Sequence, residues 1–317
     1  MRLFITIIVT SVVFLFCLFF GPSIIVPFSA SDLEREIILS IRLPRVITAF
    51  LMGSALGASG AVLQGMLRNP LADPYILGLS GGASLLAAGG MMIDSTLLGA
   101  LTTPVLAFFG ALGAGVLVGI MGWKRGGLMP ERLLLAGIGM GFLFSAVLML
   151  LMSVSTNEGL RRATLWLFGD LAMADWSLIP VGAIFIMIGF GISLWRGKAL
   201  NSLMLGDELS HSLGFSPKKE VTILFISVGL MSASSVSLGG MVGFIGLLVP
   251  HIMRAIIGAD NRILIPASAL GGGMLLMVSD LIGRVVFKPV EIPSGIITAL
   301  LGAPYFLYLL RRRDVVS

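Results

Sequence analysis

The sequence predicts an all-α polytopic membrane protein, and three observations support this prediction. Apolar residues make up 57% of the 317 residues and charged residues only 12%, about half the charged share of a soluble domain. Long stretches of the chain contain no Asp, Glu, Lys or Arg. The 41 glycines suit the close helix packing found in lipid. So few polar residues would not shield an apolar core of this size from water, so we place the chain in a bilayer.

Uncharged stretches give the candidate spans, because about 20 apolar residues cross a bilayer as a helix. They cover residues 3–31, 46–67, 74–93, 95–123, 133–157, 176–195, 221–253, 263–279 and 292–310. The first is too long for the apolar part of a signal peptide, so we retain it as a span. The stretch 221–253 is too long for one span and carries several glycines between Gly239 and Gly246, so we divide it. The prediction is ten transmembrane helices in a single domain over residues 1–317.

The basic residues set the orientation, since cytoplasmic loops are enriched in Lys and Arg. With the N-terminus inside, about two thirds of the 21 lysine and arginine residues fall on the cytoplasmic side. Both termini are therefore expected in the cytoplasm, together with the polar segment 197–220 between the sixth and seventh spans. A weak similarity between LMGSALGASGAVLQG and LFISVGLMSASSVSLGG favours five spans followed by five inverted ones.

The segment 197–220 is the longest soluble-looking passage of the chain. Its apolar residues recur at roughly helical spacing: Leu200, Leu203, Met204, Leu209 and Leu213. Gly206 and Gly214 divide it into two short helices, and Asp207 and Glu208 suit the start of the second one. Two interpretations stay open from the residues alone, an amphipathic loop on the membrane surface and a docking surface for another protein.

The sequence lacks recognisable motifs for nucleotide binding, catalysis or metal binding. No lysine has the neighbours of a GxxxxGK[ST] phosphate loop, Cys17 is the single cysteine, and the two histidines lack metal-ligand spacing. No carboxylate falls in the middle of a counted span, where an ion-coupled carrier would need one. We therefore expect no catalytic residue, no bound cofactor or metal and no nucleic-acid partner, and uphill transport would need an outside energy source. The alternatives are a self-sufficient secondary transporter or channel and, on the pair His251 and Asp280, an intramembrane enzyme.

Six gapless motifs extend over essentially the whole chain. They read IRLPRVITAFLMGSALGASGAVLQGMLRNPLADPYILGLSGGAS, RLLLAGIGM, LWLFGD, GFIGLLVPHIMR, RILIPASALGG and EIPSGIITALLGAPYFLYLLRRR. Together they resemble the FecCD-type (BtuC-like) permeases, the membrane subunits of binding-protein-dependent ABC importers for iron–siderophore complexes, haem and vitamin B12. The resemblance agrees with the predicted span number, since such a subunit has ten spans and works in pairs.

The resemblance implies a permease that is not itself an enzyme and that works by alternating access. ATP and Mg²⁺ would be used by two separate ATPase subunits on the cytoplasmic side. The other implied partners are a second copy of the chain or a close paralogue, and a substrate-binding protein on the outer side. The implied location is the bacterial cytoplasmic (inner) membrane, and the implied cargo is an iron complex, siderophore or haem, with vitamin B12 or an oxyanion as the alternative.

The resemblance also implies roles for matching residues. ATPase coupling is expected within 203–215, at Leu203, Leu205, Gly206, Asp207, Glu208, Leu213 and Gly214. Docking of the binding protein is expected at Arg42 and Arg45 of RLPR and Arg284 of SDLIGR, with anchoring at the membrane interface as the alternative; Arg161 and Arg162 lie on the same predicted side. Candidate residues of the translocation path are Gly137, Gly139 and Gly141, for which close helix packing is the alternative. The chain has Met129-Pro130-Glu131 where some relatives have small hydroxyl residues at a gate, so we transfer no gate.

Overall fold

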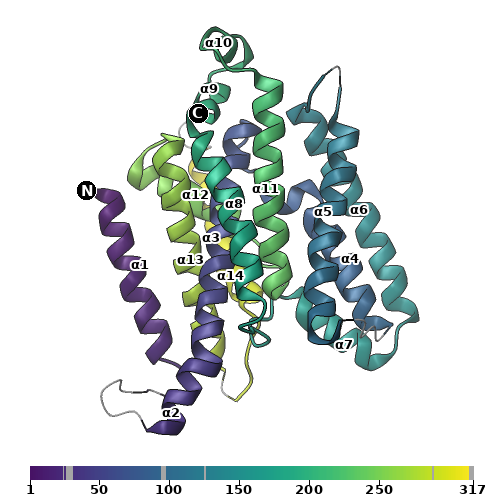
Figure 1. Cartoon of the computed structure of the whole chain (residues 1–317), viewed down its shortest axis with the longest axis vertical. Helices are drawn as coiled ribbons and strands as arrows, with labels where there is room; N and C mark the ends of the chain where they lie inside the picture. Colours follow the sequence, from purple (N-terminus) through teal and green to yellow (C-terminus); the bar gives the residue numbers. More distant parts are fainter. Residues whose placement is uncertain (24, 26–30, 94–97, 125, 288, 314–317) are drawn as a thin grey trace.

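The computed structural model describes residues 1–23, 25, 31–93, 98–124, 126–287 and 289–313, and its regular elements are helices (Figure 1). In chain order they are α1 (Arg2–Phe19), α2 (Asp32–Ile37), η2 (Ile38–Arg42), α3 (Leu43–Met66), η3 (Pro74–Leu77), α4 (Leu79–Met92), η4 (Gly99–Leu101), α5 (Thr102–Gly122), α6 (Pro130–Val154), α7 (Asn157–Leu167), α8 (Ile179–Trp195), α9 (Gly197–Met204), α10 (Asp207–Ser212), α11 (Pro217–Gly239), α12 (Ile245–Ile257), α13 (Asn261–Val285) and α14 (Ser294–Arg313). The all-α prediction is confirmed.

The apolar helices fall into two length classes. Among the described residues, six helices are long and apolar enough to cross a membrane by themselves, and α8 with α9 forms a further candidate that bends by 57°. Three shorter apolar helices, α4, α12 and α14, complete the set. The polytopic architecture is therefore present, and the number ten for the helices that cross the membrane stays a prediction.

Helix α3 forms the centre of the molecule, with most of its residues buried. It packs closely against α13, and the two backbones touch at two glycines of α3. A side chain at Gly53 would collide with the carbonyl of Gly272, and one at Gly57 with the carbonyl of Ser268. Helix backbones approach this closely only where residues are small. The contacts at Gly53 and Gly57 thus make α3 and α13 one closely packed pair.

The predicted break in the stretch 221–253 is confirmed. Helix α11 ends at Gly239, Gly240 follows with φ of 80°, and α12 begins only at Ile245, after Phe244 with φ of 68°. The first half of the chain has a similar interruption, because Gly78 with φ of 73° separates η3 from α4. In each half a long helix, α3 or α11, is followed by an irregular turn and a short helix, as an inverted repeat requires.

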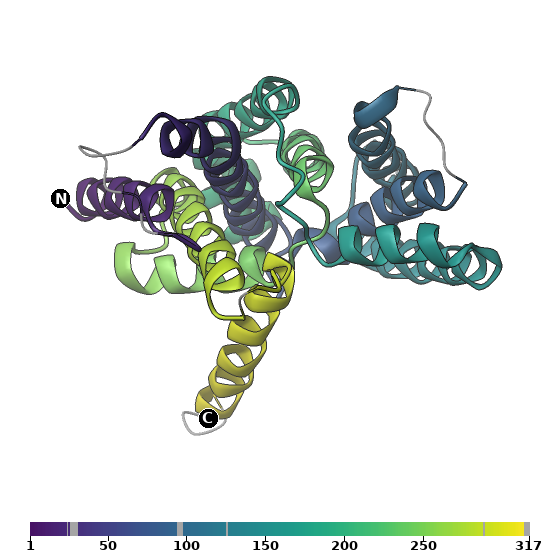
Figure 2. The same cartoon turned by 90° about the horizontal axis from the view of Figure 1, so that it is seen from below.

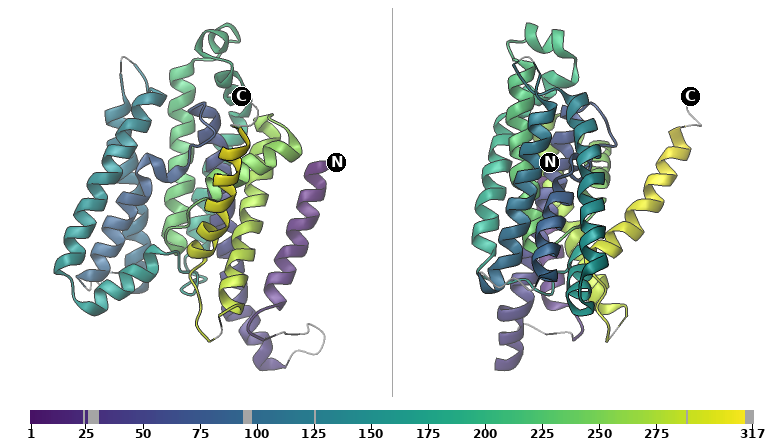
Figure 3. Two further views of the ribbon diagram at one scale, coloured as in Figure 1. Left: turned by 180° about the vertical axis from the view of Figure 1, so that it is seen from behind. Right: turned by 90° about the vertical axis from the view of Figure 1, so that its right-hand side faces the viewer.

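The two ends of the bundle differ in what they carry. Figure 1 shows α9 and α10 at one end, here called the α10 end, and α2 and α7 at the opposite end, here called the outer end. Helix α1 runs toward the outer end and α14 runs back toward the α10 end. Figure 3 shows α14 leaning away from the other helices. In Figure 2 it projects from the side opposite α5 and α8.

Candidate functional site

The segment that follows α8 forms the two short helices that the glycine positions predicted. Helix α9 buries Leu200 and Leu203, at 0% and 1% exposure. Leu203 therefore belongs to the core, whereas Leu205, Leu209 and Leu213 are 60%, 55% and 59% exposed. These three leucines form an apolar tip at the α10 end. Because exposed apolar clusters on a polar surface mark contact sites for other proteins, the tip is the candidate docking element.

Backbone conformation explains both glycines of the tip. Gly206 has φ of 111° and Gly214 has φ of 85°. A Cβ atom at either position would meet no other atom within 4 Å, so space is not what requires glycine. The left-handed conformation does, because it is unfavourable for residues that carry a Cβ. The two glycines fix the direction of α10, and Asp207 and Glu208 occupy its first turn.

Arg68, just after α3, connects the tip to the core. Its Nε donates to the carbonyl of Leu203 at 2.6 Å, and its guanidinium group also pairs with the Asp207 carboxylate. Below this contact, Leu200 packs on Gly65 of α3, where a Cβ atom would lie 2.9 Å from the leucine side chain. The segment is therefore joined to the end of α3 at two successive turns.

A second set of contacts joins α9 to the start of α13. The Asn201 Oδ1 atom accepts from the backbone N–H of Asn261 at 2.9 Å and from its Nδ2 at 2.7 Å, and Asn201 Nδ2 donates to Asp260 Oδ1 at 2.8 Å. Asp260 also accepts from the Arg262 guanidinium group and caps α13. Hydrogen bonds from Arg262 and Asn201 hold the pKa of Asp260 well below its usual range. The segment thus contacts both members of the α3–α13 pair.

The three arginines predicted to dock a binding protein lie at the outer end, where they are buried. Their exposed fractions are 4% for Arg42, 9% for Arg45 and 4% for Arg284. Arg45 pairs with Asp280 at 2.9 Å and with Glu291 at 2.7 Å. Arg284 Nε lies 2.9 Å from the other Asp280 oxygen.

Arg42 turns toward the end of α1. It donates to the carbonyl groups of Phe19 at 3.0 Å and Ser23 at 2.7 Å. We call Arg45, Asp280, Arg284 and Glu291 the outer cluster. Docking through Arg42, Arg45 and Arg284 stays a prediction, and it requires one of these buried contacts to open. Arg161 and Arg162 are exposed on α7 at the same end.

Two of the three predicted path glycines line a cavity. Gly137 and Gly141 of α6 face an open cavity of about 390 Å³, whose other residues include Tyr75, Ser80, Ser84, Phe142, Ser145 and Met241. Gly137 also lies against the Leu77 backbone, where a Cβ atom would come within 2.7 Å. Gly139 does not line the cavity, and a Cβ atom there would meet nothing within 4 Å. The cavity walls combine hydroxyl, thioether and aromatic groups.

A model of the FecCD transport family matches residues 4–312. The chain belongs to the FecCD transport family. It is 40% identical over 289 residues to the hemin transport system permease protein HmuU of Yersinia pestis, covering 90% of this chain and 86% of the relative.

Other members of the family carry different names. The cobalamin import system permease protein BtuC of Halobacterium salinarum is 38% identical, covering 91% of this chain and 77% of the relative. The iron(3+)-hydroxamate import system permease protein FhuG of Bacillus subtilis is 35% identical, with 89% and 85% covered. A solved structure described as an inward-facing metal-chelate type ABC transporter matches with a TM-score of 0.89 and 29% identity over 98% of both chains.

The sequence did not predict a role for two residues of this FecCD permease, Asp73 and Tyr75. Asp73 lies between two uncharged stretches, where the span pattern carries no signal. It is 8% exposed and packs beside Gly246 at the start of α12. Tyr75 follows on η3, and its hydroxyl accepts from the Val242 backbone N–H at 2.7 Å. The signal that was available is NPLADPY itself, a polar run with two prolines between apolar spans.

Proposed function

We propose that this chain is the permease subunit of an ABC importer that moves an iron complex, a siderophore or haem, into the cytoplasm. The family membership supports a permease, and the names of its relatives include hemin, hydroxamate–iron and cobalamin transport. In this proposal the chain carries no catalytic residue and binds no cofactor. Its location is the bacterial inner membrane, and vitamin B12 or an oxyanion is the alternative cargo.

The observation that carries the proposal is the leucine tip on a firmly attached base. Leu205, Leu209 and Leu213 are exposed, while the helix before them is joined to α3 by Arg68 and to α13 by Asn201. A loop that rested on a membrane would not need such attachments. We propose that each of two ATPase subunits holds one tip in a groove, with Asp207 and Glu208 at its rim.

The attachments determine how motion reaches the membrane. When ATP and Mg²⁺ close the ATPase pair, the two tips are drawn together and the base moves with them. Because α3 and α13 touch through their backbones at Gly53 and Gly57, they follow as one body. We propose that this movement opens the cavity between two copies of the chain toward the outer side, which is alternating access. Hydrolysis then returns the pair to its starting position.

The cargo path in this proposal runs beside α6. Gly137 and Gly141 supply a surface without side chains, and Gly139 on the same helix has open space around it for the second copy. Much of α6 is exposed, including Phe142 at 74% and Met149 at 68%. An apolar helix with so little cover suits an interface with a second copy or a close paralogue.

The outer end receives the substrate-binding protein in this proposal. Arg161 is exposed there and offers positive charge, and its neighbour Arg162 is also exposed. Arg42, Arg45 and Arg284 hold the ends of α1, α3 and α13 in place, and a docked acidic side chain would compete with Asp280 or Glu291 for Arg45. Charged rims of this kind set docking rate and orientation.

Reconstitution into liposomes tests the proposal. The permease is inserted alone or with its ATPase subunits, and uptake of hemin, a ferric hydroxamate, cobalamin and molybdate is measured with the binding protein outside. We expect uptake only with the ATPase, ATP and Mg²⁺, and with one of the two iron complexes. Uptake by the permease alone would contradict the proposal in favour of a secondary transporter. Uptake of cobalamin or molybdate alone would retain the importer and replace the cargo.

A further inference from the structure

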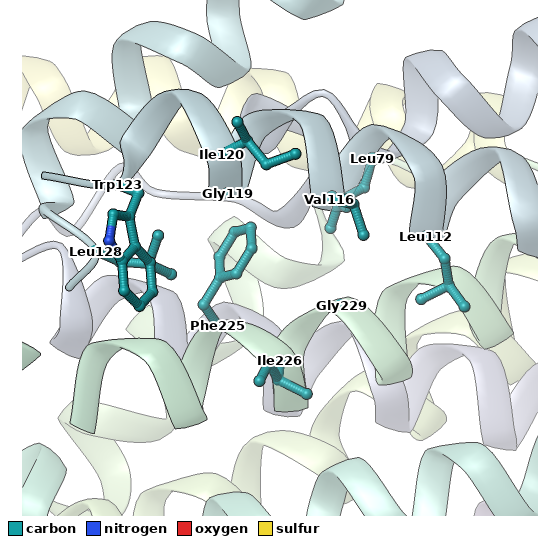
Figure 4. Close-up of a pocket in the computed structure, with 11 residues that line it drawn as sticks. Leu79, Leu112, Val116, Gly119, Ile120, Trp123, Leu128, Phe225, Ile226 and Gly229 are labelled. Atoms are coloured by element: carbon teal, nitrogen blue, oxygen red, sulfur yellow. The ribbon is translucent and has the colours of Figure 1, made fainter. Parts of the chain in front are cut away.

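An apolar groove lies between α5 and α11, away from the cavity beside α6. Its volume is about 500 Å³. The lining residues are Leu79, Leu112, Gly115, Val116, Gly119, Ile120, Trp123, Leu128, Phe225, Ile226 and Gly229. We call it the α5–α11 groove. In Figure 4 the Phe225 ring points from α11 toward α5, and Trp123 and Leu128 close one end.

The groove has a buried floor and an exposed rim. Leu79 and Phe225 are 1% and 7% exposed, whereas Val116, Ile120 and Ile226 are 61%, 67% and 52% exposed. A Cβ atom at Gly229 would meet nothing within 4 Å. The two helices therefore leave between them a space that no side chain of the chain fills.

The length of the groove matches one leaflet of a bilayer. Its α5 side extends from Leu112 to Trp123, a distance of about 16 Å at the rise of an α-helix. Half of the hydrocarbon thickness is about 15 Å. Trp123 is half exposed at the end of the groove nearest the α10 end, the level that tryptophan favours at the membrane interface. A single acyl chain of the cytoplasmic leaflet has these dimensions and this chemistry.

Basic residues lie near the Trp123 end of the α5–α11 groove. Lys124 follows Trp123, and Lys218 and Lys219 open α11 two helical turns before Phe225 and Ile226, on the same stripe of that helix. The Lys124 N–H donates to the Gly127 carbonyl at 3.0 Å.

Two acidic residues, Glu220 and Glu131, belong to these stretches. Glu220 is buried and paired with Arg196, and Glu131 lies in the first turn of α6. A phosphate held above the groove would face Lys124 and Lys219, and each lysine contributes to the attraction of an anionic lipid.

We propose that the α5–α11 groove binds one anionic phospholipid of the cytoplasmic leaflet, with an acyl chain along α5 and the headgroup phosphate between Lys124 and Lys219. A second copy of the chain is the other apolar occupant to consider. The surface proposed above for a second copy is on α6, and no residue of α6 lines this groove. Helix α14, which is also exposed, projects from the opposite side of the molecule (Figure 2). The bound lipid fills the space that separates α5 from α11.

Quenching of Trp123 by brominated lipid tests this proposal. The background is the full chain with Trp176→Phe and Trp195→Phe, which removes the other two exposed tryptophans and retains buried Trp166. The protein is placed in phosphatidylcholine vesicles in which a minor share of brominated phosphatidylglycerol or brominated phosphatidylcholine is added. We expect phosphatidylglycerol to associate beside Trp123 ~5-fold or more strongly than phosphatidylcholine, as one or two nearby lysines predict.

Paired variants test separately the contributions of the groove and of the headgroup site to lipid binding. Gly229→Leu fills the groove and should abolish the preference, with Gly119→Leu as a second filling variant; Gly113→Leu, on an exposed position of α5 where a Cβ atom meets nothing, should retain it. Lys124→Gln combined with Lys219→Gln should bring the preference for phosphatidylglycerol over phosphatidylcholine near 1. Lys198→Gln on α9 should leave this preference unchanged.

Three results would overturn the proposal. One is equal quenching by both lipids in the parent. Another is a preference that survives both filling variants. The third is protection of Trp123 from either lipid, which would place a second copy of the chain in the groove.

Discussion

The two ends of the α3–α13 pair carry similar charged residues in opposite environments. At the α10 end, Arg68 pairs with Asp207 through side chains that are 42% and 70% exposed. At the outer end, Arg45 and Asp280 are 10% and 3% exposed. Exposed ion pairs contribute little and exchange readily with water, whereas removing one partner of a buried pair is costly. The comparison indicates that the Arg45–Asp280 pair contributes more to the stability of the fold than the Arg68–Asp207 pair.

The largest effect is expected from a substitution that breaks the outer cluster. Asp280→Asn would leave both Arg45 and Arg284 buried without their common carboxylate. We expect a loss of about 3–5 kcal/mol in the free energy of unfolding, measured by thermal unfolding of the purified protein in detergent. Asp207→Asn is the matched change at the α10 end and should cost less than about 1 kcal/mol. Equal costs for the two variants would remove the distinction between the ends.

A smaller effect is expected from the backbone of the tip. Gly206→Val places a β-branched residue at φ of 111°, with strain of about 1–2 kcal/mol confined to the segment. We expect the variant to fold and hydrolyse ATP with its partner, while cargo uptake falls ~10-fold or more. Gly191→Val on α8 is the control, because a Cβ atom there also meets nothing within 4 Å and its backbone is helical. Normal uptake by Gly206→Val would show that the direction of α10 does not matter.

The exposed leucines should affect assembly more than folding. Leu209→Glu changes a side chain that is 55% exposed, so the free energy of unfolding should stay within about 0.5 kcal/mol. ATPase binding should weaken ~10-fold, as expected for an apolar anchor in an interface. Leu33→Glu on α2, 68% exposed at the outer end, serves as the control in the same co-purification. ATPase retention that is equal for both variants would place the interface elsewhere.

The smallest effect concerns pH. Hydrogen bonds from Arg262 and Asn201 lower the pKa of Asp260 in the folded protein. A lowered pKa stabilises the folded state above the ordinary aspartate pKa of about 3.9, and that contribution is lost as the pH falls toward the lower, folded value. Asp260→Asn should therefore lower the unfolding temperature at pH 7 and make less difference below pH 4. A constant difference across this range would exclude the charge of Asp260 as the cause.

Local sequence signals predicted the local features well. The uncharged stretches located the apolar helices, the glycines of 239–246 located the break before α12, and Gly206 and Gly214 divided the segment after α8 into α9 and α10. Each of these depends on residues close together in the chain. The spacing of apolar residues, the length of the uncharged stretches and the backbone conformations open to glycine were sufficient to predict these features.

Contacts between distant residues could not be predicted in the same way. Arg45 and Asp280 are 235 residues apart, and the sequence offers no sign that the predicted rim arginine turns inward. Asn201 and Asn261 are likewise joined across 60 residues. Leu203 has the same spacing as the exposed leucines, although it is buried. Spacing identifies a helix face and leaves open what covers it.

The central claim is that motion of the leucine tip reaches the membrane helices through the contacts of α9. Asn201→Ala tests it most directly, because it removes the hydrogen bonds to Asp260 and Asn261 and leaves the tip unchanged. The measurement is the number of cargo molecules taken up per ATP hydrolysed in liposomes. We predict near-normal hydrolysis with a ~10-fold lower ratio, and an unchanged ratio for Ser212→Ala, whose hydroxyl donates to the Glu208 carbonyl within α10. An unchanged ratio in Asn201→Ala would contradict the account.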